Sequence, residues 1–346
     1  MSQQPRSAVI RDVARLAGVS HQTVSRVMNN HPSVRPETHD RVMKAVHQLN
    51  FRPNANARGL AAGRSRLIGV ISHEPLLFGP ASTLLGVERA ARTAGYGVSV
   101  VTLEQLDHHS VTEALDRLTA QAVAGVAVIA PLLSATAAAA AQSVLAAVPA
   151  VVVEPDAVAD LPTVAVDQVE GARLAVEHLL SLGHETVWHL SGPPTWSQAR
   201  GRADGWRQAL EAAQRAVPPT LTGDWSPRSG YDAGLELAGR SDVSAVFCAN
   251  DHQALGLLRA LHERRVRVPE DISVVGFDDI PESRFLSPPL TTVRQDFDEV
   301  GRRCLGTLLE LIEGDEPAAP VSHLRVRPTL MVRASSDRPS RLAVSR

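Results

Sequence analysis

The sequence predicts an N-terminal all-α domain followed by an α/β core of two doubly wound parallel-sheet lobes. Two observations predict the core: short apolar runs alternate with amphipathic stretches of helical period from residue 66 onward, and this alternation occurs as two successive series. A third observation predicts a separate head, because residues 1–66 contain only helical patterns. With 346 residues, of which 44% are apolar, the chain can bury the cores of two or three domains.

The head and the core differ in charge. Residues 1–66 hold eleven basic and three acidic residues, a net charge of +8, whereas the remainder holds 24 basic and 34 acidic residues, a net charge of −10. A basic end on an acidic body is expected where one end of a chain meets a polyanion such as nucleic acid. A solvated basic tail or a targeting arm would give the same charge, so the charge alone leaves these alternatives open.

Residues 10–29 predict a helix-turn-helix. Apolar residues recur with helical spacing on both sides of the tetrapeptide AGVS. Within it, Gly18 permits the left-handed turn that ends the first helix, Val19 can plug the core, and Ser20 can cap the second helix. The expected apolar faces are Val13, Leu16 and Ala17 in the first helix and Val24, Val27 and Met28 in the second, and a third helix is expected at Pro36–Leu49.

The second helix of such a motif enters the major groove of DNA. Its outward residues here are His21, Gln22, Ser25, Arg26 and Asn29, and glutamine and arginine side chains can read the edges of adenine and guanine. A small helical packing domain with ordinary polar surface residues is the alternative to this interpretation.

The head is followed by an alanine-rich segment that is too short to form a stable helix alone. It contains an apolar residue, Leu60, flanked by small residues and by Arg58 and Arg64. A segment that folds only when it is paired and in contact with DNA can act as a switch. We therefore expect residues 53–65 to form a hinge helix and linker.

The core elements follow in two series of apolar strands and amphipathic helices, which implies parallel sheets with right-handed crossovers. Because ligands of open α/β sheets bind at the carboxyl ends of the strands, two facing lobes would enclose a solute. In the first series we expect strands at 67–72, 96–101, 125–130 and 150–153, and helices at 81–95, 110–121 and 135–147. In the second series we expect strands at 162–167, 186–190, 221–225, 245–249 and 273–278, and helices at 169–182, 197–215, 229–238 and 252–264.

The sequence argues against several other classes of protein. No apolar stretch precedes the first charges, which argues against export, and two cysteines, Cys248 and Cys304, cannot build a disulfide framework. The uncharged stretch 118–153 is as long as a membrane span, but it is alanine-rich and divides better into two strands and a helix. No GxGxxG or P-loop motif follows a strand, and the adjacent His108 and His109 are expected to be solvated. We therefore expect a cytoplasmic protein with no membrane segment, cofactor or metal.

Eight motifs occur in an order and at a spacing that identify one family. They are DVARLAGVSHQTVSRVMN, LNFRPNANARGLAAG, SRLIGVI, AVEHLLSLGH, GDWS, ANDHQALG, DISVVGFDDI and PPLTTVRQDF. On these motifs the sequence resembles the lactose-repressor (LacI/GalR) family of bacterial transcription regulators over nearly its whole length, particularly the galactoside-sensing members. The resemblance implies a homodimer whose paired recognition helices bind a pseudo-palindromic operator in double-stranded DNA, and a core of the periplasmic-binding-protein fold.

The resemblance also implies roles for residues of the head and hinge. Leu60 of each hinge helix would wedge into the central minor-groove step and kink the DNA, with Arg58 beside it in the expected DNA-binding set. The chain ends without leucine heptads, so a dimer is expected rather than a tetramer. Base contacts would come from His21, Gln22 and Arg26, and phosphate or nearby backbone contacts from Ser20, Thr23, Ser25, Asn29 and Asn54.

In the core, the resemblance implies a sugar site. A pyranose needs an aromatic face for its C–H groups and planar polar groups for its vicinal hydroxyls. Trp196 would narrow the pocket or extend it for a disaccharide, and Ala130 and Pro131 stand where sugar-binding relatives often carry an asparagine. Taken singly, each polar residue has an ordinary structural alternative as a solvated or turn-capping side chain. The expected site residues are Trp225 for the aromatic face, Arg202, Asn250 and Asp278 for the hydroxyls, His73, Leu77, Pro80 and Glu154 from the first lobe, and Gln295 near a crossover.

Together these observations predict a sequence-specific transcriptional repressor that a galactoside or related saccharide releases from its operator. A corepressor-type regulator and a soluble sugar-binding protein without regulatory output are the alternatives. An enzyme is not expected, because Glu154 and Asp278 could form a glycosidase pair but Arg202 and Asn250 fit binding better than turnover. The predicted domains are the head at 1–52, the hinge at 53–65, the core at 66–335 and a flexible tail at 336–346, with lobe 1 at 66–165 and 295–323 and lobe 2 at 166–292 and 324–334.

Overall fold

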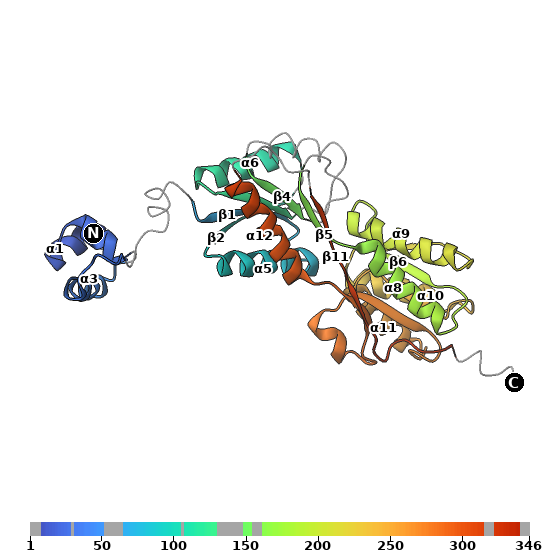
Figure 1. Cartoon of the computed structure of the whole chain (residues 1–346). Helices are drawn as coiled ribbons and strands as arrows, with labels where there is room; N and C mark the ends of the chain where they lie inside the picture. The colour runs from blue at the N-terminus through green and yellow to red at the C-terminus, as the bar shows by residue number, and fades with distance from the viewer. Residues whose placement is uncertain are drawn as a thin grey trace, which may run out of the picture. The chain divides into compact units, whose positions relative to one another are not determined.

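The structure, a computed structural model, describes most of the chain (Figure 1). The chain divides into two compact units, Met1–Arg66 and Leu67–Arg346, and each is described here by itself. The described residues are 8–28, 31–51, 65–104, 107–129, 148–153, 161–314 and 322–339. Among them, no helix combines the length and the apolar character that crossing a membrane requires.

The described part of the head contains three helices and is built on the expected helix-turn-helix. It consists of α1 (Ile10–Ala17), α2 (His21–Met28) and α3 (Pro36–Gln48). Gly18 ends α1 in the left-handed conformation at φ 63°, and the Ser20 hydroxyl accepts a hydrogen bond from the Thr23 N–H at 3.1 Å, which confirms the cap of α2. The shared core contains Val13, Ala14 and Ala17 of α1, Val24 and Val27 of α2, and Val42, Ala45 and Val46 of α3.

One residue of the expected α1 face was assigned wrongly. Leu16 is 47% exposed, and Ala14 takes its place in the core. The buried face of α1 is centred between Val13, Ala14 and Ala17, which puts Leu16 about 100° around the helix from that centre.

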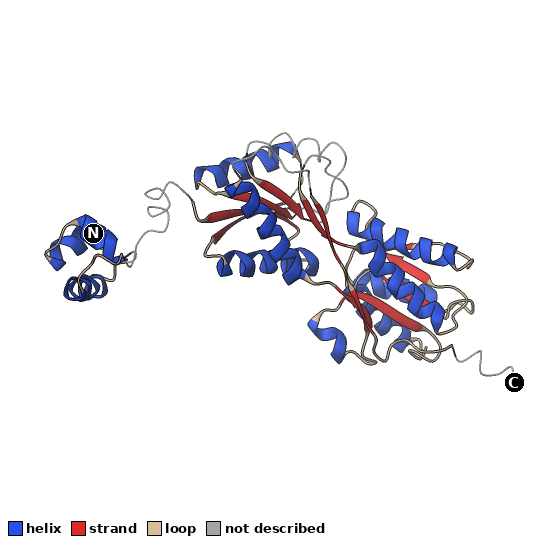
Figure 2. Ribbon diagram, viewed as in Figure 1, coloured by secondary structure: helices blue, strands red, loops and turns tan. Residues whose placement is uncertain are grey.

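The first lobe is a six-stranded parallel sheet in the order β11-β5-β4-β3-β1-β2. Figure 2 shows helices packed against the strands of both lobes. Helices α5 (Phe78–Thr93) and α12 (Phe297–Glu313) cover one face of it, and α6 (His108–Ala120) covers the other. The expected helix at 135–147 lies outside the described residues. The strands are β1 (Leu67–His73), β2 (Gly97–Leu103), β3 (Gly125–Ile129), β4 (Ala150–Val153), β5 (Thr163–Val166) and β11 (His323–Val326).

The second lobe is a six-stranded sheet in the order β12-β10-β9-β8-β6-β7, parallel except for the antiparallel pair of β10 and β12. Helices α8 (Gln168–Ser181) and α9 (Ser197–Ala212) cover one face. Helices α10 (Pro227–Leu237) and α11 (Asp251–Glu263) cover the other. The strands are β6 (Trp188–Ser191), β7 (Leu221–Thr222), β8 (Ala245–Cys248), β9 (Ser273–Asp278), β10 (Thr291–Arg294) and β12 (Thr329–Met331), with a 3-10 turn, η1, at Pro281–Phe285.

Within the described residues of the core, the chain crosses between the two lobes three times. The crossings fall between β5 and α8, between β10 and α12, and between β11 and β12. The third crossing follows Val326, slightly later than the expected boundary at 323, because β11 pairs in parallel with β5 along its whole length. Ser336, the first residue of the expected flexible tail, is buried and bonds to Thr291.

Candidate functional site

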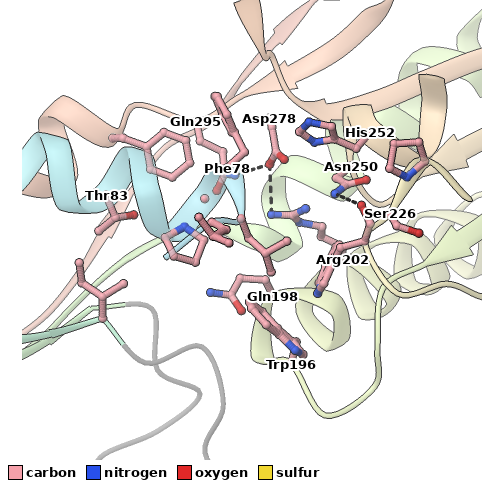
Figure 3. Close-up of a pocket in the computed structure, with 18 residues that line it drawn as sticks. Phe78, Thr83, Trp196, Gln198, Arg202, Ser226, Asn250, His252, Asp278 and Gln295 are labelled. Carbon is pink, nitrogen blue, oxygen red and sulfur yellow. Dashed lines mark hydrogen bonds and ion pairs between the residues drawn. The ribbon is translucent and has the colours of Figure 1, made fainter. Parts of the chain in front are cut away.

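A cavity of about 280 Å³ lies between the two lobes, near the carboxyl ends of their strands (Figure 3). From the first lobe and α12 it is lined by Leu76, Leu77, Phe78, Gly79, Pro80, Thr83, Ile129 and Phe297. From the second lobe and the crossover it is lined by Trp196, Gln198, Arg202, Trp225, Ser226, Pro227, Asn250, His252, Asp278 and Gln295. Among the described residues, the first lobe therefore contributes mainly apolar groups and the second lobe the polar and charged ones.

The cavity brings together eight of the ten expected ligand-binding residues. Glu154, like Ala130 and Pro131, lies outside the described residues. His73 does not line the cavity: its Nδ1 donates to the Leu103 carbonyl at 3.1 Å, and the centre of its buried ring lies 6.4 Å from that of Trp196, which does line it. The eight residues are Leu77, Pro80, Trp196, Arg202, Trp225, Asn250, Asp278 and Gln295.

Trp225 owes its orientation to a turn directly after β7. The N–H of Ser226 donates to Asp224 Oδ1 at 3.0 Å, and this turn holds Trp225 at φ 72°, in the left-handed region. The turn also explains why β7 ends at Thr222 rather than at the expected residue 225. The indole lies against Gly192, where a Cβ atom would come within 2.3 Å of the ring. Only glycine can occupy that position without moving the indole.

A second indole makes a corner with the first. The Trp196 and Trp225 ring centroids are 5.7 Å apart, and the ring planes meet at 71°. Both side chains are buried, and with Ala199 and Ala249 they form a small apolar cluster against which Leu77 of the first lobe packs. The corner offers C–H groups of a ligand two aromatic surfaces at a steep angle.

Four buried polar side chains form a closed circuit beside the corner. Arg202 Nε donates to Gln168 Oε1 at 2.8 Å, and Gln168 Nε2 donates to Gln295 Oε1 at 3.0 Å. Gln295 Nε2 donates to Asp278 Oδ1 at 2.7 Å, and the same carboxylate oxygen lies 3.6 Å from Arg202 Nη2. Figure 3 shows the Asp278 carboxylate between Gln295 and Arg202.

The circuit is anchored to the rest of the lobe. Arg202 Nη1 donates to the Ala249 carbonyl, and the guanidinium lies 3.8 Å from the centre of the Phe277 ring. Asn250 caps α11, since its Oδ1 accepts from the Gln253 N–H at 2.8 Å while its Nδ2 donates to the Trp225 carbonyl at 3.1 Å. The polar groups that a ligand would meet are therefore fixed in place before it binds.

Burial sets the charge state of this region. Burial raises the pKa of Asp278 to about 6, although Arg202, the Gln295 hydrogen bond and His252 act in the opposite direction. Burial, reinforced by the charge of Asp278, also raises the pKa of Asp251 well above its usual value. Because the positive charge of Arg202 is offset by Asp278 within the protein, the cavity suits a neutral, hydroxyl-rich ligand.

Several lining residues were not expected from the sequence. Gln198 and Ser226 lie within two residues of Trp196 and Trp225, and His252 follows the motif residue Asn250 by two positions. Proximity to these motifs is the signal that could have identified them. The other unexpected groups are Leu76, Phe78, Gly79, Thr83, Ile129, Pro227 and Phe297 on the cavity wall and Gln168 in the polar circuit.

The head presents the expected recognition helix. On α2, His21, Gln22 and Arg26 are exposed, whereas Ser25 is half-buried. Ser20 and Thr23 bond to each other through their hydroxyls at 2.9 Å, at the exposed start of the helix. The remaining expected DNA-binding residues, Asn29, Asn54, Arg58 and Leu60, lie outside the described residues.

Comparison with known proteins identifies both parts of the chain. Residues 9–54 match the bacterial regulatory proteins of the lacI family, and residues 176–336 match a periplasmic binding protein-like domain. The Escherichia coli (strain K12) lactose operon repressor is 35% identical over 96% of this chain and 94% of its own length. The HTH-type transcriptional repressor PurR of Haemophilus influenzae (strain Rd) is 34% identical, over 95% of this chain and 98% of its own length. A crystal structure of the lac repressor dimer bound to operator and the anti-inducer ONPF superposes with a TM-score of 0.86 at 34% identity, covering 96% of this chain and all of that chain.

Proposed function

Because this chain belongs to the lacI family of bacterial regulatory proteins, and is therefore a DNA-binding transcriptional repressor rather than an enzyme, we propose that its effector is a small sugar. The sugar binds in the cavity between the lobes and releases the repressor from its operator. A galactoside or related saccharide is the proposed class, supported by the GDWS turn that carries Trp225 and by the similarity to a lactose operon repressor. The proposed place of action is the nucleoid, in the cytoplasm.

The observation that supports a sugar best is the indole corner. Its two ring planes meet at 71°, so a planar base cannot lie parallel to both. The puckered ring of a pyranose presents C–H groups in more than one direction and can contact both indoles. Arg202 and Asp278 then lie on the polar side of the cavity, where vicinal hydroxyls need paired donors and acceptors.

We propose that the sugar regulates operator binding by changing the orientation of the two lobes relative to each other. In a homodimer, one arrangement holds the two hinge segments, residues 53–65, close enough to fold on a pseudo-palindromic operator, where Leu60 enters the minor groove. A sugar that binds the other arrangement more tightly separates the hinges. A 100-fold loss of operator affinity requires roughly 2.7 kcal/mol of differential binding.

An anisotropy titration tests the effector and its sign together. The full chain is bound to a labelled operator fragment selected from genomic DNA, and methyl β-D-galactoside, lactose, glucose, ribose and hypoxanthine are added in turn. We expect at least one saccharide, and not hypoxanthine, to weaken operator binding. A response to hypoxanthine alone would contradict a sugar effector, and tighter operator binding with sugar would show the corepressor sign.

The recognition helix has a separate test. Arg26→Ala is expected to weaken operator binding by about 1–3 kcal/mol and to relax the preference at one base position, because an exposed arginine on α2 can read a guanine edge. Arg41→Ala, on the exposed face of α3, removes the same charge and serves as the control. Binding to a library of operator variants measures both effects, and an unchanged base preference in Arg26→Ala would refute the base contact.

A further inference from the structure

We propose that Gln168 is a positioning residue of the effector site, which holds Arg202 in place and links it to the crossovers about which the lobes rotate. Gln168 does not line the cavity, and no sequence motif pointed to it. It is the first residue of α8, on the first crossover between the lobes. The inference rests on the proposed function in one respect, because it assumes that Arg202 and Asp278 contact the effector.

The hydrogen-bonding capacity of the four side chains fixes which atoms donate and which accept in the circuit. An arginine guanidinium can only donate hydrogen bonds and an ionised carboxylate can only accept them, whereas a glutamine amide does both. Arg202 therefore fixes the Gln168 amide with its oxygen toward the guanidinium and its nitrogen toward Gln295. Gln295 is fixed in turn, and its nitrogen donates to Asp278. Both amides are consequently locked into one orientation between the two charges.

Because the four side chains are buried, each hydrogen bond of the circuit contributes to the placement of Arg202. The four side chains are only 4–7% exposed, so water cannot replace a partner that is lost. A buried hydrogen bond to a charged group contributes more than one in water, and leaving such a group without its partner is costly. Without the Gln168 oxygen, the Nε atom of Arg202 would lose the acceptor that fixes the plane of the guanidinium beside Asp278.

The circuit also joins two crossovers. Gln168 follows β5 on the first, and Gln295 lies between β10 and α12 on the second. A rotation of one lobe against the other must change the backbone at both positions, since both segments run from lobe to lobe. The bond between the two amides therefore ties the geometry of the crossovers to the placement of Arg202 and Asp278. A ligand that contacts Arg202 and Asp278 therefore binds one lobe arrangement more tightly than another.

Two substitutions test separately whether Gln168 holds Arg202 in place and whether it links Arg202 to the crossovers. Gln168→Leu removes both amide functions at similar volume. Gln168→Glu keeps an oxygen for Arg202 but cannot donate to Gln295 and places two oxygens against each other. Gln208→Leu, on the exposed face of α9, is the control for the chemical change. Each full-length variant is checked for folding by urea denaturation and titrated with the saccharide to which the wild type responds most strongly, free and bound to operator.

We expect Gln168→Leu to bind that saccharide about 10- to 100-fold more weakly, the range that corresponds to losing one hydrogen bond to a charged group. Gln168→Glu should keep most of the saccharide affinity but lose most of the ratio between operator affinities without and with saccharide. A merely structural role would leave that ratio unchanged. Wild-type saccharide affinity and wild-type ratio in Gln168→Leu would overturn the proposal, as would a wild-type ratio in Gln168→Glu.

If the wild type responds to none of the saccharides, the proposed function fails and the circuit is tested without a ligand. Gln168→Leu, Gln295→Leu and the double variant then form a double-mutant cycle in urea midpoints. Non-additive shifts of the midpoint support the coupling between the crossovers, and additive shifts overturn it.

Discussion

At the scale of single residues, the cavity depends on how tightly Trp225 is held. The indole occupies a left-handed backbone position and lies directly on the backbone of Gly192. A bulky residue adopts that backbone conformation only when its surroundings enforce it. The hydrogen bond of the Asp224 turn restrains the backbone of Trp225, and the close contact with Gly192 restrains its ring.

Gly192→Ala should therefore weaken saccharide binding while leaving the fold intact. The added methyl group would stand 2.3 Å from the Trp225 ring, and relief of such overpacking costs about 1–3 kcal/mol or requires the indole to move. Gly239→Ala, whose methyl would meet nothing closer than 3.9 Å, is the matched control. Isothermal titration with the responding saccharide measures the effect, and equal affinities for the two variants would contradict it.

Saccharide affinity should also depend on pH through Asp278. Its pKa of about 6 means that the carboxylate is ionised at pH 7 and mostly protonated at pH 5, when it can no longer accept from both Gln295 and a sugar hydroxyl. Affinity should fall by about tenfold between these pH values, following the ionised fraction. Asp278→Asn should bind weakly and without this pH dependence, whereas His252→Asn should keep it. A pH-independent wild type would contradict the assignment.

At this scale, the sequence predicted eight of the eighteen described residues that line the cavity. Trp225, Asn250 and Asp278 were predictable because each stands in a motif at the end of a strand or within three residues of it. His73 also ends a strand, yet its ring turns to the carbonyl of Leu103, a partner thirty residues away that local pattern does not reveal. Gln168 was not predicted because its role depends on how two crossovers come together.

At the scale of elements, the first-lobe wall of the cavity depends on how closely α5 and α12 pack. A Cβ atom on Gly301 would lie 2.1 Å from the backbone carbon of Gly86, so the two helices touch through glycine. This contact brings the starts of both helices together at the cavity, where the rings of Phe78 and Phe297 meet edge to face at 5.9 Å.

Two substitutions in α12 should have opposite effects on stability. Gly301→Ala forces the helices apart and should lower the free energy of unfolding by about 1–3 kcal/mol. Gly306→Ala meets nothing within 4 Å, so the gain in helix propensity should raise stability by about 0.5–1 kcal/mol. Urea denaturation measures both, and stabilisation by Gly301→Ala would show that the helices separate without cost.

Element prediction succeeded where apolar runs are long, but no element beyond residue 278 was predicted, neither β10 and α12 nor the edge strands β11 and β12. The apolar strands β4 and β9 have the expected bounds. The edge strands β11 and β12 were not predicted as strands, because HLRV and TLM are largely exposed and show no apolar run. An edge strand is defined by the neighbour it pairs with, and pattern alone does not supply that neighbour.

At the scale of the whole molecule, buried histidines make stability depend on pH. His189 stacks on Phe247 and donates from Nδ1 to the Phe247 carbonyl, and burial lowers its pKa to about 4. The unfolded chain binds the proton near pH 6.5, before the folded chain does. Acidification from pH 6.5 to pH 4 therefore favours unfolding.

The contribution of His189 can be isolated by substitution. His189→Phe should be less stable than wild type at pH 7.5, because the Phe247 carbonyl loses its donor. By pH 4 the free energy of unfolding of the wild type should have fallen by about 3 kcal/mol because of this histidine. The difference in stability between the two proteins should therefore shrink or reverse. His178 and His184, whose pKa values burial also lowers, are common to both proteins and cancel. A constant difference in urea midpoints would exclude the effect.

The two-lobe architecture was predictable from the alternation of strands and helices, and the expected lobe bounds included the return of the chain to each lobe, but the order of the strands within each sheet was not predicted. Sheet order depends on long-range pairing, and β11 joins β5 across more than 150 residues. In the second lobe, β12 pairs with β10, and beyond it Ser336 bonds to Thr291 of β10, where a free tail was expected.

The three crossings also limit how the chain can be recombined with its relatives. Each lobe is assembled from separate stretches of sequence, and the final strands complete the outer edge of both sheets. A chimera with one junction inside the core must therefore mix two parents within at least one hydrophobic interior. The head is joined to the core by a single passage of chain, so it can be exchanged as one block, and gene shuffling can alter operator choice far more readily than it can transplant half of an effector pocket.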